Sequence, residues 1–232
     1  MTQQPLRVLC LHGYTQNAQK FRDRTGPFRR SLKRALELVY VTAPHQATDF
    51  QPPEPAVDDG PSAAWWNRSG RPWAEIKQSV RFLRQTMHEQ GPFDGILGFS
   101  QGSGMAAILM ALIQAAHTQS TAFFGNDAEL AALVDELAAC PPPKFAMLFA
   151  GFYPDLPQFD ALIKGPAGPI AVPSLHMVGE KDAIVPMERG KLLASQAFVD
   201  ATLLTHEGGH FVPCNAAWRK RYQEFISALP AQ

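Results

Sequence analysis

One five-residue turn constrains the fold of this chain more than any other feature of the sequence. Gly98-Phe99-Ser100-Gln101-Gly102 matches the pattern G-x-S-x-G, and it stands between an apolar run at 93–99 and a helix-like segment at 101–116. A sharp turn from a strand into a helix strains its central residue and leaves no room for a Cβ on either side, which explains both glycines. The sequence therefore predicts a strand, a tight turn that presents the Ser100 hydroxyl, and a helix.

The same alternation of strand-like and helix-like segments runs along the whole chain. Short apolar runs predict strands at 6–11, 38–41, 93–99, 145–150, 174–178 and 201–205. Helical spacing of apolar residues predicts helices at 18–36 (interrupted by Gly26-Pro27), 73–89, 101–116, 127–139, 186–198 and 213–229. Strands that alternate with helices form mainly parallel sheets covered on both faces. We therefore expect an α/β fold with a sheet of about six strands.

Composition narrows the class of protein further. The chain has 232 residues, of which 46% are hydrophobic, and this length fits one domain over 1–232. A formal net charge of zero argues against nucleic acid as a partner. The longest apolar run, 105–113, is too short to span a bilayer, and the N-terminus has no signal-peptide pattern. Three isolated cysteines, Cys10, Cys140 and Cys214, form neither a disulfide framework nor a metal-ligand spacing. We expect a soluble cytoplasmic protein without a metal.

Prolines gather in two segments, with six of the 20 in 44–72 and eight in 141–173. Both segments follow predicted strands, and loops in this position border the sheet edge where Ser100 is expected. We therefore predict that the Pro-rich loops 44–72 and 152–173 lie near the active site. Their aromatic residues would form an apolar wall of the pocket: Trp65, Trp66, Phe152 and Tyr153. The alternative for the two tryptophans is that they anchor their loop to the core.

A serine hydroxyl is a weak nucleophile and needs a base, which in turn needs an acid to orient it. With this turn the chain order is serine, acid, histidine. His210 lies just past the last predicted strand, where it would reach over the edge that holds Ser100, and His206 is the alternative base. Asp182, in the loop after 174–178, is the predicted acid, and Glu180 is its alternative.

The oxyanion that forms during acyl transfer needs two convergent backbone N–H groups. One is expected from Gln101, the residue after the nucleophile, and the other from Tyr14 in the loop after the first strand. In the same loop, Gly13 lets the backbone turn close to a substrate, and His12 is expected to form hydrogen bonds within the loop rather than to transfer protons.

Several motifs together resemble the FSH family of serine hydrolases, which includes fungal esterases and a human tumour-associated esterase. They are Leu11-His12-Gly13-Tyr14-Thr15-Gln16-Asn17, Ala43-Pro44-His45, Trp65-Trp66, the stretch 91–102, Ser174-Leu175-His176 and Gly208-Gly209-His210-Phe211-Val212-Pro213. The resemblance implies a compact α/β-hydrolase that cleaves carboxylic esters, with a triad on Ser100, Asp182 and His210, in agreement with the residue-level prediction. Some relatives cleave thioesters, including acyl chains on carrier proteins.

The leading hypothesis is therefore a serine esterase that cleaves esters with apolar acyl chains through an acyl-enzyme, without a cofactor. The alternative is a thioesterase that acts on acyl carrier protein or acyl-CoA, with Arg68 and Arg71 meeting a phosphopantetheine phosphate. A non-catalytic binding protein with the same fold is the third hypothesis, and the complete set of triad residues argues against it. The expected partners are a small-molecule ester or an acyl carrier, with no nucleic acid and no stable membrane insertion.

Overall fold

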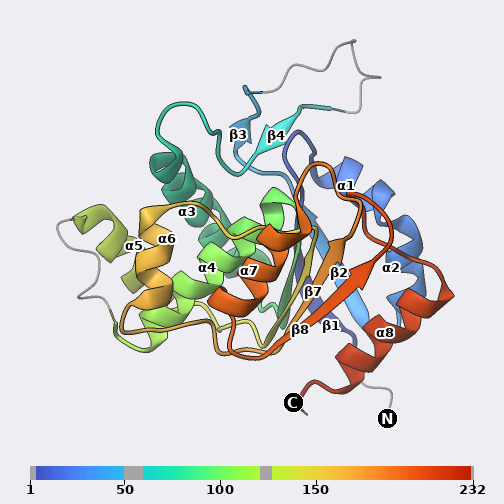
Figure 1. Cartoon of the computed structure of the whole chain (residues 1–232). Helices are drawn as coiled ribbons and strands as arrows, with labels where there is room; N and C mark the ends of the chain where they lie inside the picture. The colour runs from blue at the N-terminus through green and yellow to red at the C-terminus, as the bar shows by residue number, and fades with distance from the viewer. Residues whose placement is uncertain (1–3, 50–59, 121–126, 231–232) are drawn as a thin grey trace.

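The fold is built on one parallel sheet of six strands in the order β2-β1-β5-β6-β7-β8 (Figure 1). It is seen in a computed structural model that describes residues 4–49, 60–120 and 127–230. The strands are β1 (Leu6–Leu11), β2 (Leu36–Val41), β5 (Gly95–Phe99), β6 (Phe145–Phe149), β7 (Ser174–Gly179) and β8 (Ala201–His206). Every pairing within this sheet is parallel, which confirms the predicted α/β class.

Helices cover both faces of the sheet (Figure 1). One face carries α1 (Ala18–Arg24), α2 (Gly26–Leu32) and α8 (Ala216–Ser227). The other carries α3 (Pro72–Gln90), α4 (Gln101–His117), α5 (Ala128–Leu137), α6 (Pro157–Lys164) and α7 (Met187–Ala197). Alternate residues of β1 enter opposite cores, Leu9 and Leu11 on one side and Val8 and Cys10 on the other. Burial on both faces explains why the strands are almost continuously apolar.

Helix α4 runs through the larger core, and all its residues except Gln114 and His117 are buried. This burial accounts for the apolar run 105–113 without any membrane. None of the helices in the described ranges has both the length and the apolar character that crossing a bilayer requires.

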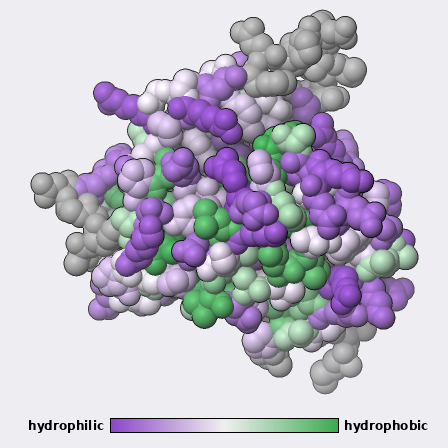
Figure 2. Space-filling view, in the orientation of Figure 1, coloured by the Kyte–Doolittle hydropathy of each residue, from purple (hydrophilic) through white to green (hydrophobic). Residues whose placement is uncertain are grey.

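On the face of the molecule that carries α7 and β8, hydrophilic residues surround several separate hydrophobic groups (Figure 2). Leu192, Val199 and Leu203 are exposed apolar residues in and between these two elements. Small apolar groups of this kind are ordinary on protein surfaces.

Two predicted loops contain regular structure. Helix α6 lies inside the segment 152–173, where Pro157 occupies the first turn and Phe159, Leu162 and Ile163 face the core. The segment 44–72 contains a short antiparallel pair, β3 (His45–Gln46) and β4 (Ala63–Ala64). The prediction of loops without regular structure was therefore wrong for both segments. In 152–173 the many prolines indicated a loop, although a proline is also common in the first turn of a helix, as Pro157 is in α6.

The last helix is shorter than the predicted segment 213–229. Helix α8 begins at Ala216 rather than at Pro213, because Asn215 accepts the Trp218 N–H at 3.1 Å and caps it. Residues 50–59 of the predicted loop 44–72 lie outside the described residues, as do residues 121–126 between the predicted helices 101–116 and 127–139.

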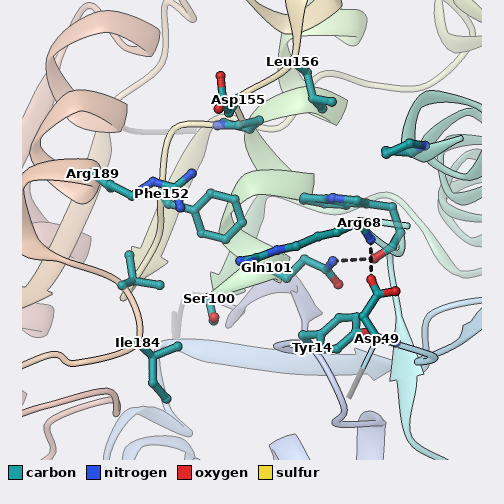
Figure 3. Close-up of a pocket in the computed structure, with 14 residues that line it drawn as sticks. Tyr14, Asp49, Arg68, Ser100, Gln101, Phe152, Asp155, Leu156, Ile184 and Arg189 are labelled. Carbon is teal, nitrogen blue, oxygen red and sulfur yellow. Dashed lines mark hydrogen bonds between the residues drawn. The ribbon is translucent and has the colours of Figure 1, made fainter. Parts of the chain in front are cut away.

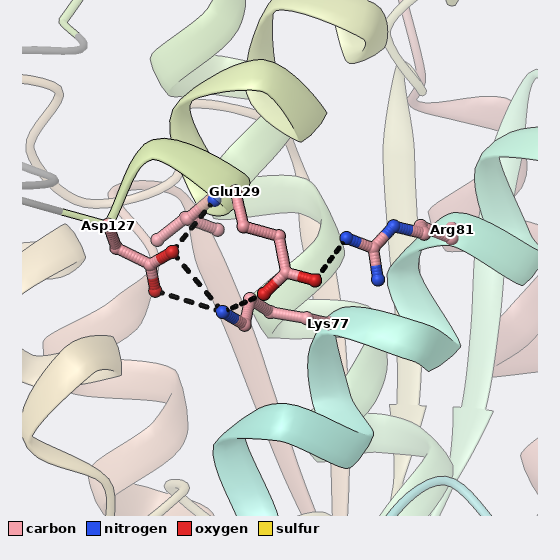
Figure 4. Close-up of polar contacts among 5 residues, drawn as sticks. Lys77, Arg81, Asp127 and Glu129 are labelled. Carbon is pink, nitrogen blue, oxygen red and sulfur yellow. Dashed lines mark hydrogen bonds and ion pairs between the residues drawn. The ribbon is translucent and has the colours of Figure 1, made fainter.

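An ion-pair network fastens the beginning of α5 to α3 (Figure 4). Lys77 Nζ lies 3.1 Å from Asp127 Oδ2 and also contacts Glu129, whose second oxygen lies 2.5 Å from Arg81 Nη2. Asp127 also accepts the Leu130 N–H at 3.0 Å, so the same carboxylate caps α5. Burial lowers the pKa of Lys77, but its hydrogen bonds to Glu129 and Asp127 outweigh this effect and raise it. The network thereby steadies α3, which begins at the loop above the sheet edge.

The turn between β5 and α4 is tight for a steric reason. A Cβ on Gly98 would lie 2.5 Å from Ser103 Cα, and a Cβ on Gly102 would lie 2.1 Å from the Leu11 carbonyl oxygen. Between them Ser100 has φ 54° and ψ −117°, a conformation that is strained for a residue with a side chain. The Ser100 N–H donates to Phe149 O at 2.9 Å and holds the turn against β6.

We expect Gly102→Ala to destabilise the protein by about 3 kcal/mol, because the new Cβ meets main chain that cannot move independently. The measurement is the free energy of unfolding in urea. Gly26→Ala is the matched control, since beyond its chain neighbours the new Cβ meets only the flexible end of Arg30 at 3.2 Å. Its cost is the crowding of the new Cβ by Pro27 in helical backbone, and it should destabilise the protein less than Gly102→Ala does. Equal stability of the two variants would contradict the close packing of α4 against β1.

Candidate active site

Ser100, Asp182 and His210 follow three different strands of the sheet, β5, β7 and β8. Because these strands are parallel, their carboxyl ends meet at one edge and bring the three residues to the same side of the molecule. The His210 ring packs against the ring of Phe99, with centroids 4.9 Å apart, so the histidine lies next to the residue that precedes Ser100.

Asp182 and His210 are directly hydrogen bonded. His210 Nδ1 lies 2.7 Å from Asp182 Oδ2, so the ring donates its Nδ1–H to the carboxylate. In the neutral ring Nε2 is then unprotonated and can accept a proton. The other carboxylate oxygen accepts the N–H groups of Ile184 at 2.9 Å and Val185 at 2.8 Å. The Asp182 side chain is only 1% exposed, and these three hydrogen bonds offset the cost of burying its charge.

The two alternative residues occupy different surroundings. His206 Nδ1 accepts the Gly208 N–H at 3.2 Å, and its ring packs against Phe211. Burial lowers the pKa of His206. The Glu180 side chain is exposed, unlike that of Asp182. The geometry therefore favours the pair Asp182–His210 over any pair that includes His206 or Glu180.

His12 is a buried structural residue of the loop after β1. Its Nε2 accepts the Ala43 N–H at 2.9 Å, so Nδ1 carries the proton and donates it to Gly13 O at 2.7 Å. Burial lowers the pKa of His12 to about 4, and the hydrogen bond to Gly13 O only partly opposes this shift. A neutral ring engaged at both nitrogens fits the expected role within the loop.

Trp65 ties this loop to the turn and to α3. Its indole N–H donates to His12 O at 2.8 Å, and its main-chain N–H donates to Gln101 Oε1 at 2.9 Å. The same Gln101 side chain donates to Trp66 O at 2.7 Å, and Ser79 Oγ donates to Trp65 O at 2.6 Å. Trp65 is fully buried. Trp65 therefore anchors its loop to the core, as in the alternative hypothesis for the two tryptophans, and it is not among the residues that line the pocket.

The N–H groups of Tyr14 and Gln101 are available to a ligand. Gly13 N–H donates to Gln16 Oε1, and the N–H groups of Thr15 and Gln16 donate to main-chain carbonyls. Within the described residues, the N–H groups of Tyr14 and Gln101 have no such acceptor. The one on Gln101 belongs to the first turn of α4, where the helix dipole favours negative charge. Among residues 4–49, 60–120 and 127–230, these two main-chain donors near Ser100 thus lack an acceptor.

A pocket of about 610 Å³ opens above Ser100 and Gln101 (Figure 3). Both Pro-rich segments contribute to it. Trp66 and Phe152 are lining residues, and their rings lie 6.3 Å apart. Tyr153 is not a lining residue: its hydroxyl donates to Asp160 at 2.7 Å and its ring packs against Phe159. The remaining lining residues are Tyr14, Asp49, Arg68, Pro72, Pro154, Asp155, Leu156, Ile184, Val185 and Arg189.

Several of these lining residues were missed by sequence reasoning. Ile184 and Val185 lie two and three residues after Asp182, so their proximity to the predicted acid was a usable signal. Arg189 had no signal, because a single arginine in the first turn of a helix is ordinary. Among the described residues no group of three or more His, Cys, Asp or Glu side chains is arranged to hold a metal ion.

We expect the His12 ring to stay neutral from about pH 8 to about pH 5, because its pKa lies near 4 rather than 6.5. The measurement is ¹⁵N NMR of protein labelled in its histidines. The spectrum should show His12 with a protonated Nδ1 and an unprotonated Nε2. The unfolded chain binds this proton more readily, so the stability linked to His12 is present above pH 6.5 and is lost as the pH falls towards 4. Titration of this ring near pH 6.5 would contradict the assigned role.

Comparisons with known proteins show the family of this chain. A family model described as serine hydrolase (FSH1) matches residues 1–222. Esterase OVCA2 of Danio rerio is 33% identical over 246 residues, which cover 97% of this chain and 98% of the relative.

Solved structures show the same architecture at lower identity. The crystal structure of esterase PE8 matches with a TM-score of 0.62 at 18% identity, covering 97% of this chain and 93% of that one. Acyl-protein thioesterase 2 of Zea mays matches with a TM-score of 0.57 at 14% identity, covering 96% and 94%. These likenesses establish the α/β-hydrolase fold. The chain therefore belongs to the serine hydrolase (FSH1) family and is an enzyme of the hydrolase and esterase type.

Proposed function

We propose that this protein hydrolyses carboxylic esters with apolar acyl chains, through an acyl-enzyme on Ser100. One observation carries the proposal. The hydrogen bond of 2.7 Å between His210 and Asp182 lies at the sheet edge that also presents Ser100 on a strained turn. A serine beside an oriented imidazole is suited to nucleophilic attack on a carbonyl carbon.

The reaction proceeds in two symmetrical halves. His210 Nε2 takes the proton from Ser100 Oγ as this oxygen attacks the ester carbonyl, and Asp182 stabilises the imidazolium. The N–H groups of Tyr14 and Gln101 bind the oxyanion. The ring then returns the proton to the departing alcohol and leaves an acyl group on Ser100. Water repeats the same steps, and the carboxylic acid departs.

The pocket suits an apolar acyl chain. Trp66 and Phe152 form an aromatic side, and Leu156, Ile184 and Val185 add aliphatic surface. A volume of about 610 Å³ lies within the usual range for sites that take small organic ligands. The substrate therefore gains binding energy mainly from burial of its chain, which leaves the polar groups at Ser100 for the carbonyl.

Thioester hydrolysis is the second candidate, and Arg68 favours it. This residue lines the pocket, where its cationic side chain suits a phosphopantetheine phosphate of coenzyme A or an acyl carrier protein. Arg71 is not among the lining residues. Parallel rates for p-nitrophenyl esters and acyl-coenzyme A thioesters of matched acyl length separate the two candidates.

We expect Ser100→Ala to abolish hydrolysis of p-nitrophenyl acyl esters and labelling by a fluorophosphonate probe, because the nucleophile is gone. Asp182→Asn should lower kcat on the order of 10²–10⁴-fold, because the neutral amide no longer fixes the His210 tautomer. Steady-state kinetics on both variants provide the measurement.

Glu180→Gln is the matched control for the acid, because it makes the same carboxylate-to-amide change two residues away on an exposed side chain. Its kcat should stay close to that of the wild type. Full activity in Ser100→Ala would refute the proposal, and a larger loss in Glu180→Gln than in Asp182→Asn would reassign the acid.

A further inference from the structure

Two arginine side chains enter the pocket that contains Ser100. Arg68 comes from the segment between β4 and α3, and Arg189 comes from the first turn of α7. They approach from opposite sides, and Figure 3 shows both guanidinium groups directed towards the Phe152 ring. The lining of a pocket that is otherwise largely apolar thus includes two cationic groups.

Carboxylates within the described residues partner these two groups only loosely: besides the hydrogen bond from Ser69, the charge of Arg68 helps to lower the pKa of Asp49, yet the Arg68 and Asp49 side chains form no ion-pair contact. No ion pair there includes the Arg68 or the Arg189 guanidinium. Asp49 lines the same pocket, but its carboxylate accepts the main-chain N–H of Arg68 at 2.5 Å and contacts the Ser69 hydroxyl. The Ser69 hydrogen bond is the main cause of the lowered pKa of Asp49. Asp155 is exposed and lies well apart from Ser100 in Figure 3.

Arg189 is held in place before any ligand arrives. Its guanidinium carbon lies 4.8 Å from the centroid of the Phe152 ring, and Nη2 donates to Tyr153 O at 3.5 Å. Stacking on an aromatic ring fixes the plane of the group. A guanidinium has five N–H donors, so this arrangement leaves donors for a planar anionic group in the pocket.

We propose that the substrate carries an anionic oxygen group, a carboxylate or a phosphate, which Arg189 and Arg68 bind while the scissile carbonyl lies at Ser100. The inference rests on the proposed function and narrows its substrate class. Guanidinium groups bind carboxylates and phosphates through charge-assisted, bidentate hydrogen bonds, and a water-poor pocket strengthens them. The aromatic and aliphatic lining then contacts the chain between the carbonyl and the anion.

The first test compares two p-nitrophenyl esters with six-carbon acyl chains: the hexanoate, and the hemiadipate, whose chain ends in a carboxylate. The readout is the ratio of their kcat/KM values, hemiadipate over hexanoate. We expect Arg189→Met and Arg68→Met each to lower this ratio about ten- to a hundredfold, the range for a lost hydrogen bond to a charged group. Arg189→Lys keeps the charge and should keep part of the preference.

A phosphate source is tested in the same way with hexanoyl-coenzyme A and hexanoyl-pantetheine, which share the thioester and differ in the nucleotide phosphates. The readout is the kcat/KM for hexanoyl-coenzyme A divided by that for hexanoyl-pantetheine. If this ratio falls in the two methionine variants, the recognised group is a phosphate. If the ratio of hemiadipate to hexanoate falls instead, the recognised group is a carboxylate. Arg34→Met is the matched control, because it removes an exposed positive charge just before β2, at the opposite end of the strands from Ser100.

The ratios separate this inference from the proposed function. Each ratio is measured on one preparation, so a misfolded fraction cancels. Hexanoate cleavage with both ratios unchanged in both arginine variants would overturn the anion site and leave the esterase intact. Hexanoate cleavage that persists in Ser100→Ala would instead overturn the proposed function.

Discussion

The close contact between Gly102 and the Leu11 carbonyl is the constraint on which the rest of the site depends. It lets the first turn of α4 lie directly against the end of β1, so the loop of Tyr14 and the turn of Ser100 become neighbours. A side chain at position 102 would separate the main chain of Tyr14 from that of Gln101, whose N–H groups we propose as oxyanion donors. The steric limit at two glycines thus determines an electrostatic property of the site.

The groups that hold this arrangement are uncharged. His12, Trp65 and Gln101 form a buried set of hydrogen bonds that joins the loop after β1, the loop before α3 and the start of α4. Because burial keeps the His12 ring neutral, neither salt nor pH near neutrality weakens these bonds. The strained backbone of Ser100 is therefore supported by packing and neutral hydrogen bonds.

Much of the fold could be predicted from the sequence because strands of a two-sided parallel sheet are nearly continuous apolar runs, as in β6. The turn at Ser100 and the loops of Asp182 and His210 follow such runs, so their common edge was predictable as well. The different roles of Trp65 and Trp66 were not, because both rings are buried in the same core cluster and the sequence does not say which of two adjacent rings borders the pocket. The place of Arg189 in the pocket lining could not be predicted either, because only the tertiary fold brings the segments that form the pocket wall together.

In the loop after β7, the main chain and the side chains of the same residues have different roles. Ile184 and Val185 hold Asp182 through their N–H groups, and the same two residues present their side chains to the pocket. Most substitutions at these positions keep the main-chain donors and change only the shape of the wall. Variation at Ile184 and Val185 can therefore change the shape of the pocket wall while the hydrogen bonds that hold the Asp182 carboxylate stay in place, so the pocket can evolve next to a residue that is fixed by main-chain contacts.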